Sequence, residues 1–129
     1  MKSFLLDTHV FLWMITEESK LTAGVTDILE NSDNKLFMSI ACLWEIAIKY
    51  QLGKLPLAKA PEKYIPHHLS ITGVQILPIE PNHALSIHTL PLHHRDPFDR
   101  MMICQAKIER IPILTQDRVF RKYDVKTLW

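Results

Sequence analysis

Short apolar runs alternate with longer stretches of mixed apolar and polar residues, which is typical of strands that alternate with helices. The apolar runs predict strands at residues 4–6, 36–38, 75–79, 111–114 and, at the edge of the sheet, 125–128. The mixed stretches predict helices at 8–15, 22–30, 40–52, 61–69, 81–88, 97–109 and 117–122. Continuous apolar strands that are each followed by a helix indicate a parallel sheet covered on both faces. We therefore expect an α/β fold.

Several helix boundaries carry recognisable end signals. Ser39 is placed to cap a helix that Gly53 stops. Asp96 and Pro97 are suited to the N-cap and the first position of the helix that follows them. Pro66 interrupts the segment 61–69 and weakens the prediction of a helix there.

Length and composition narrow the class of protein. With 129 residues, 47% of them hydrophobic and 22% charged, the chain is expected to form a single domain over 1–129. No apolar run reaches the roughly 20 residues of a membrane span, and polar Asp7 comes too early for a signal peptide, so we expect a cytoplasmic protein without a membrane partner. Cys42 and Cys104 lie far apart, which indicates neither a disulfide framework nor a zinc knuckle.

The net charge of +1 conceals a gradient along the chain. Residues 1–34 carry two basic and six acidic side chains, whereas residues 95–129 carry eight basic and five acidic ones. A basic C-terminal third is compatible with a nucleic-acid partner, although solvated lysines and arginines are the usual explanation of such a charge excess.

Ligands of open parallel sheets bind at the carboxyl ends of the strands. The residues at these ends are Asp7, Ser39, Glu80 and the segment 115–117, which includes Asp117. Asp7 and Asp117 are suited to chemistry there, but helix N-capping accounts for each of them equally well.

Glu45 is harder to explain as a surface residue. It is the only acid among eight apolar residues between Ile40 and Ile48, a pattern that predicts a helix buried on all sides. Buried glutamates are rare unless they are paired or bind a metal. The alternative is an ion pair with Lys49, one helical turn further on.

Asp99 lies three residues after Asp96, at the start of the helix 97–109. Capping explains Asp96 well, and the helix dipole favours an acid at the position of Asp99. That position also points out of the first turn of the helix, so a role in a site stays open.

Four acids are therefore placed to converge: Asp7, Glu45, Asp99 and Asp117. Converging carboxylates repel one another unless a cation neutralises them. An all-oxygen set of ligands favours Mg²⁺, or Mn²⁺, over zinc. Such an ion supports metal-assisted hydrolysis of a phosphodiester.

Four segments of the chain, which contain these acids, resemble the PIN-domain ribonucleases, and among them the VapC-type toxins of toxin–antitoxin pairs. The similar stretches are Leu-Leu-Asp-Thr-His, Ser-Ile-Ala-Cys-Leu-Trp-Glu-Ile-Ala-Ile-Lys, His-Arg-Asp-Pro-Phe-Asp-Arg-Met-Met-Ile-Cys-Gln-Ala and Leu-Thr-Gln-Asp-Arg-Val-Phe, in family order over nearly the whole chain. The resemblance implies a three-layer α/β/α sandwich with a central parallel sheet. It also implies a Mg²⁺-dependent endoribonuclease that acts on RNA, is blocked by a cognate antitoxin, and forms a homodimer.

Carried over by motif, the resemblance implies that Asp7 and Asp99 are direct metal ligands. Glu45 and Asp117 then act directly or through water. Either Asp96 or Asp99 matches the third acid, and we choose Asp99 because the helix after it aligns better.

The resemblance also suggests roles for polar residues around the acids. Thr8, Ser39 and Thr115 are similar to the hydroxyl residues that support or cap the acidic motifs. From their position just before Asp99, and not from the resemblance, His94 and Arg95 are expected to contact RNA phosphate.

Two other kinds of domain, and a non-enzymatic form of the PIN domain, are alternatives to this interpretation. A haloacid-dehalogenase phosphatase requires a second aspartate where His9 stands, and a phospho-receiver domain requires a pair of acids after the first strand. A degenerate PIN domain that serves only as a scaffold remains the alternative, but the presence of all four acids argues against it.

Overall fold

The computed structural model describes residues 2–129 and forms one five-stranded sheet in the order β3-β2-β1-β4-β5, with all neighbouring strands parallel. The strands are β1 (Ser3–Leu6), β2 (Lys35–Ser39), β3 (Gln75–Leu77), β4 (Ile113–Leu114) and β5 (Thr127–Leu128). β1 is central, since Leu5 is in register with Phe37 of β2 on one side and with Ile113 of β4 on the other.

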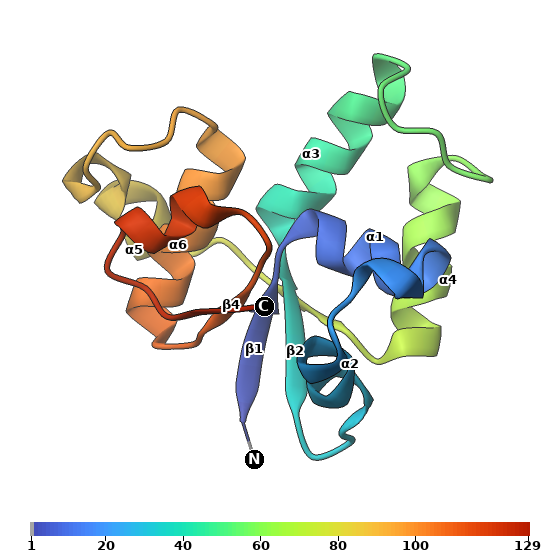
Figure 1. Cartoon of the computed structure of the whole chain (residues 1–129). Coiled ribbons are helices and arrows are strands. Elements are labelled where there is room, and N and C mark those ends of the chain that lie inside the picture. Colours follow the sequence, from blue (N-terminus) through green and yellow to red (C-terminus); the bar gives the residue numbers. More distant parts are fainter. Residues whose placement is uncertain (1) are drawn as a thin grey trace.

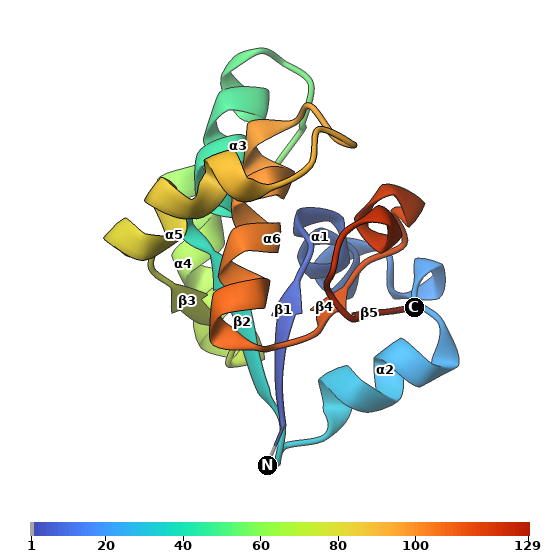
Figure 2. The same cartoon turned by 90° about the vertical axis from the view of Figure 1, so that its left-hand side faces the viewer.

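Helices cover both faces of this sheet. The α-helices are α1 (Thr8–Thr16), α2 (Ala23–Glu30), α3 (Ile40–Gln51), α4 (Pro61–Thr72), α5 (Pro81–Leu85) and α6 (Pro97–Glu109). Three 3₁₀ turns complete the structure: η1 (Glu18–Lys20), η2 (Ser86–Thr89) and η3 (Arg118–Lys122). α5 and α6 lie on one side of the strands, and α1, α2 and α4 on the other (Figure 1). Seen from the side in Figure 2, α6 lies in front of the sheet. The expected three-layer sandwich is confirmed.

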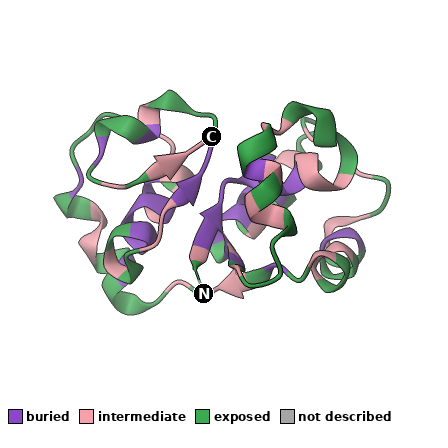
Figure 3. Cartoon of the chain, turned by 60° about the horizontal axis from the view of Figure 1, so that its bottom comes forward, coloured by how far each residue is buried: buried purple, intermediate pink, exposed green. Residues whose placement is uncertain are grey.

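The core lies where the apolar runs predicted it. Leu5 and Leu6 of β1 and both residues of β4 have no solvent-exposed surface. Figure 3 shows these two strands as buried stretches between the helical layers. Cys42 and Cys104 are buried free thiols that pack as part of this core.

Prolines shorten two of the predicted strands but do not interrupt the helix α4. β3 ends before Pro78 and β4 begins after Pro112, since a proline has no N–H to donate to a ladder. α4, by contrast, continues through Pro66 to Thr72. Glu62, whose carbonyl would have accepted the missing hydrogen bond, is exposed, and the helix still buries Tyr64 and Ile65.

The predicted helix 81–88 divides into α5 and η2, and the predicted helix 117–122 is the 3₁₀ turn η3. No helix among residues 2–129 is both long enough and apolar enough to cross a membrane.

α3 is not buried on all sides, so that prediction is wrong. Ile40 is 38% exposed and Trp44 is 61% exposed, although Glu45 retains only 4% of its surface. α3 packs against β2, α4 and α6, and the ring of Phe98 on α6 lies edge-on to that of Trp44 at 5.3 Å between ring centroids, yet most of Trp44 and part of Ile40 remain uncovered.

Candidate active site

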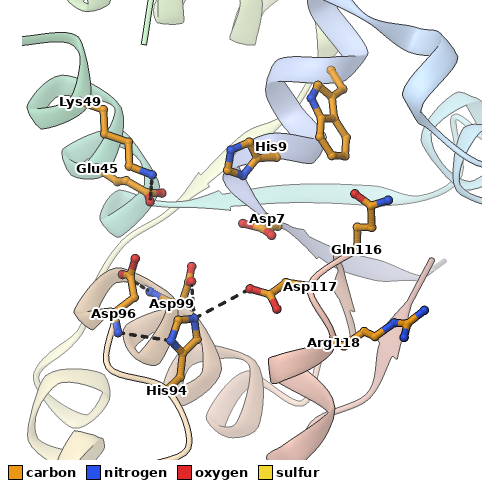
Figure 4. Close-up of a pocket in the computed structure, with 11 residues that line it drawn as sticks. Asp7, His9, Glu45, Lys49, His94, Asp96, Asp99, Gln116, Asp117 and Arg118 are labelled. Atoms are coloured by element: carbon orange, nitrogen blue, oxygen red, sulfur yellow. Dashed lines mark hydrogen bonds and ion pairs between the residues drawn. The ribbon is translucent and has the colours of Figure 1, made fainter. Parts of the chain in front are cut away.

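A pocket of about 700 Å³ opens at the carboxyl ends of β1 and β4 (Figure 4). It is lined from one side by α1 and α3 and from the other by the start of α6 and the segment after β4. Its lining residues are Asp7, His9, Trp13, Glu45, Lys49, His94, Asp96, Asp99, Gln116, Asp117 and Arg118. All four predicted acids are among them.

Asp7 lies at the end of β1 and precedes α1. Its backbone N–H donates to Leu114 of β4 at 3.0 Å, so the main chain of the sheet holds it in place. Its Oδ2 accepts a hydrogen bond of 2.8 Å from the hydroxyl of Thr115. Burial raises the pKa of Asp7, and the hydrogen bond from Thr115 opposes this rise.

Glu45 uses both carboxylate oxygens within the protein. Oε1 accepts from the hydroxyl of Thr8 at 2.7 Å, and Oε2 lies 2.8 Å from the ammonium of Lys49. The ion pair that the sequence left as an alternative is therefore present. The same contact raises the pKa of Lys49, so that the lysine stays charged beside the buried acid.

Asp99 projects into the pocket from the first turn of α6. Burial and then the neighbouring charges of Asp7, Asp96, Glu45 and Asp117 raise the pKa of Asp99 to about 8. Its Oδ2 lies 2.8 Å from Nε2 of His94, its close polar contact in the pocket.

Asp96 and Asp117 both act as caps. Oδ1 of Asp96 accepts from the backbone N–H groups of Phe98 and Asp99 at the start of α6. Oδ1 of Asp117 accepts from the N–H of Val119 at 2.9 Å, while its Oδ2 lies 3.9 Å from Nε2 of His94. Asp117 is therefore both a cap and a wall of the pocket.

Two of the three hydroxyl residues contact acids, and the third caps a helix. Thr8 donates to Glu45 and Thr115 donates to Asp7. Ser39 caps α3 by accepting from the N–H of Ala41, and it also donates to the buried side chain of Gln105. Gln105 in turn donates to the carbonyl of Pro78, which ties α6 to the ends of two strands.

Sequence reasoning missed several members of this pocket, namely His9, Trp13, Lys49 as a lining residue, Gln116 and Arg118. The adjacency of Gln116 and Arg118 to Asp117 was the available signal. His94 lies in the pocket, whereas Arg95 is exposed and outside its lining.

The pocket suits a divalent cation. Among the described residues, ligand atoms of His94, Asp99 and Asp117 lie within 4.8 Å of one another, and Asp7 lines the same cavity. Burial raises the pKa of both Asp7 and Asp99, and the charges of the neighbouring acids add to the rise for Asp99. Carboxylate oxygens are the ligands that Mg²⁺ and Mn²⁺ prefer.

A model of the PIN domain matches residues 4–126. The chain belongs to the PIN domain family. One relative of this PIN domain is Ribonuclease VapC16 of Mycobacterium tuberculosis (strain ATCC 25618 / H37Rv), which is 36% identical over 61 residues. That alignment covers 47% of this chain and 42% of the relative, so the match spans less than half of the relative's length.

Solved structures share the fold of this PIN domain. VapBC2 from Rickettsia felis, bound to a DNA fragment from its promoter, matches with a TM-score of 0.73 and 14% identity over 98% of this chain and 97% of the other. VapBC-5 from Mycobacterium tuberculosis, a member of the VapBC family of toxin–antitoxin systems, matches with a TM-score of 0.55 and 18% identity over 95% and 90% of the two chains.

Proposed function

We propose that this PIN domain is a Mg²⁺-dependent endoribonuclease and the toxin of a toxin–antitoxin pair. The observation that carries the proposal is the meeting of four acids from four separate segments in one pocket at the carboxyl ends of the strands. The similarity to a VapC ribonuclease supports RNA as the substrate, and such a substrate implies that the protein acts in the cytoplasm.

Within this proposal, Asp7 and Asp99 hold the cation directly, and Glu45 and Asp117 hold it directly or through water. The cation, when bound, lowers the pKa of an attacking water and stabilises charge on the phosphoryl oxygens. Mn²⁺ fits the same oxygen ligands. Thr8 and Thr115 keep the two most buried acids in place through their hydroxyl groups.

Basic side chains at the rim of the pocket are suited to the RNA backbone. Lys49 on α3 and Arg118 at η3 line the pocket on opposite sides, with Lys49 turned toward Glu45 and Arg118 pointing outward (Figure 4). Arg95 is exposed just before α6, outside the lining of the pocket. Cationic side chains that neutralise phosphates supply most of the sequence-independent affinity for nucleic acid. We infer that Arg118 and Arg95 orient the scissile phosphate over the acids, whereas Lys49 is engaged by Glu45.

Two protein partners belong to the same proposal. The fold shared with VapBC toxin–antitoxin complexes supports a cognate antitoxin that restrains the nuclease. The uncovered apolar face of α3, which carries Ile40 and Trp44, supports a homodimer, because exposed apolar patches mark interaction surfaces.

The experiment is a screen of structured and unstructured RNAs for cleavage with Mg²⁺, with Mn²⁺ and with excess EDTA. Asp7→Asn is the test variant, and Asp33→Asn, an exposed aspartate outside the pocket, is its matched control. We expect cleavage by the wild type and by Asp33→Asn, and none by Asp7→Asn or in EDTA. A protein that binds RNA but never cleaves it, with or without metal, would instead be the degenerate scaffold.

A further inference from the structure

A chain of hydrogen bonds leads from a buried arginine to the carboxylate of Asp99. Nε2 of His94 lies 2.8 Å from Oδ2 of Asp99, and both side chains are mostly shielded from solvent. The other oxygen, Oδ1 of Asp99, has no hydrogen-bond partner among the described residues. One oxygen of this carboxylate is therefore held, and the other is free.

The hydrogen-bond partners of His94 determine which ring nitrogen carries the proton in the neutral ring. The backbone N–H of Asp96 points at Nδ1 from 3.3 Å, so Nδ1 is the acceptor. Nε2 then carries the hydrogen and donates it to Asp99. Direct binding of a cation by Nε2 would move the hydrogen to Nδ1, where it would face the N–H of Asp96. The geometry therefore favours His94 as a donor over His94 as a ligand.

Arg100 and Tyr123 hold the main chain of His94 by hydrogen bonds. The N–H of His94 donates to the hydroxyl oxygen of Tyr123 at 2.8 Å. Arg100, which is 9% exposed, donates to the carbonyls of Pro91 at 2.9 Å, Ile87 at 3.2 Å and His94 at 3.4 Å, and to the same hydroxyl oxygen at 3.4 Å.

Arg100 thus satisfies its buried charge with carbonyl and hydroxyl oxygens and makes no ion pair within the described residues. A buried guanidinium is costly unless it is fully hydrogen-bonded. Because its three carbonyl acceptors lie in the segment 87–94, Arg100 holds this segment in one conformation, and with it the backbone of His94.

We propose that His94 is a positioning residue for Asp99, which it orients so that Oδ1 is presented to the cation. The inference rests on the proposed function, in which Asp99 holds that cation. Hydrogen bonds that orient a ligating carboxylate strengthen metal binding, and their loss typically weakens it about 10- to 100-fold. His94 acts only through Asp99 and makes no contact with the reacting atoms.

The test measures affinity for Mn²⁺ itself by calorimetric titration of the RNA-free protein, together with the melting temperature of each variant. His94→Ala removes the donor. His94→Gln replaces it with an amide N–H that reaches in the same direction. His93→Ala is the matched control, because His93 is the exposed neighbour whose ring lies against Tyr123 and outside the pocket.

We expect His94→Ala to weaken Mn²⁺ binding about 10- to 100-fold, His94→Gln to recover most of the affinity, and His93→Ala to match the wild type. If the imidazole acted only as a nearby positive charge, its removal would strengthen Mn²⁺ binding, which is the opposite sign. A His94→Ala protein that binds Mn²⁺ as the wild type does overturns the proposal. If the same protein has also lost affinity for RNA, His94 is a phosphate contact instead.

Equal loss in His94→Ala and His94→Gln, with both variants folded, also overturns the proposal. A wild type that binds no Mn²⁺ removes the proposed function, and this proposal with it. A wild type that binds Mn²⁺ while His94→Ala is unaffected removes this proposal alone.

Discussion

Each acid of the pocket is held by a different kind of partner. Thr115 holds Asp7, Thr8 and Lys49 hold Glu45, and His94 contacts Asp99. These partners differ in charge, so substitutions of the acids are expected to differ in their effects on stability and activity.

The ion pair between Glu45 and Lys49 invites a direct comparison of its two members. Glu45→Gln removes a carboxylate from the proposed metal site, so we expect RNA cleavage to fall about 10- to 100-fold. Lys49→Ala keeps the carboxylate and should retain most of the activity, although it leaves a buried acid without its cation and should lower the melting temperature of the metal-free protein. The measurements are cleavage rates and melting curves.

If both variants lost activity to the same extent, the ion pair itself would be the essential feature and the proposed role of Glu45 would be wrong.

Asp99 makes the stability of the metal-free protein depend on pH. The folded-state pKa of about 8 lies above the ordinary value of 3.8 for an aspartate, so the folded protein binds the proton more tightly than the unfolded chain. The resulting stabilisation is complete below about pH 4 and is lost as the pH rises through about 8, with a slope of at most about 1.4 kcal/mol per pH unit.

Asp99→Asn cannot ionise. It should therefore flatten the fall in the free energy of unfolding between pH 4 and 8, and it should be more stable than the wild type at pH 8. Urea unfolding in chelator at several pH values measures this, and identical pH profiles for the two proteins would contradict it.

At the scale of elements, α6 carries two aspartates with separable tasks. Both line the pocket, but Asp96 accepts from two N–H groups at the start of the helix, whereas Asp99 contacts His94 within the pocket. The motif alone left either residue as the third acid, and the capping geometry now supports the choice of Asp99.

Asp96→Ala should cost about 1 kcal/mol of stability, as the loss of an N-cap does, and should leave cleavage largely intact. Asp99→Asn should abolish cleavage in the same assay. Urea unfolding and RNA cleavage measure both variants. An Asp96→Ala protein as inactive as Asp99→Asn would mean that the two aspartates act together as the third acid.

At the scale of the whole molecule, the acidic pocket and the uncovered face of α3 have different expected partners. The pocket suits a cation and RNA, while the face with Trp44 suits another apolar surface.

The homodimer is tested at Trp44. We expect the wild type to sediment at twice the 15.0 kDa of the single chain, and Trp44→Lys to sediment as a monomer, because a lysine on this face would be desolvated without a partner. Glu18→Lys, on the exposed η1 turn, serves as the charge control. A wild type that is monomeric at high concentration would contradict the homodimer.

The growth of cells that overexpress the protein tests the proposed toxin–antitoxin pair. Overexpression of the wild type alone should arrest growth, and co-expression of a neighbouring small open reading frame should relieve the arrest. Asp7→Asn should remove the arrest without preventing the complex, since a single carboxylate contributes little to an interface formed largely by apolar helix packing. Growth curves and co-purification measure the two effects. Harmless overexpression of the folded wild type, or arrest unchanged by Asp7→Asn, would count against the toxin.

Local sequence determined the order of the elements, most helix starts and the choice of the four acids as site candidates. These features depend on interactions between residues that are close together in the chain. Apolar runs bury as strands, and Ser39 and Asp96 cap the helices that follow them. The parallel topology then brings the acids to one edge of the sheet.

Tertiary packing decided the contacts between residues far apart in the sequence, which the hydrophobic periodicity of the chain does not encode. The partner of Asp7 lies 108 residues away at Thr115, and Ser39 meets Gln105 across 66 residues. The buried contacts of Arg100 and the open face at Trp44 follow from which segments happen to cover one another. Such contacts arise only when distant segments pack together, so no pattern within one segment specifies them.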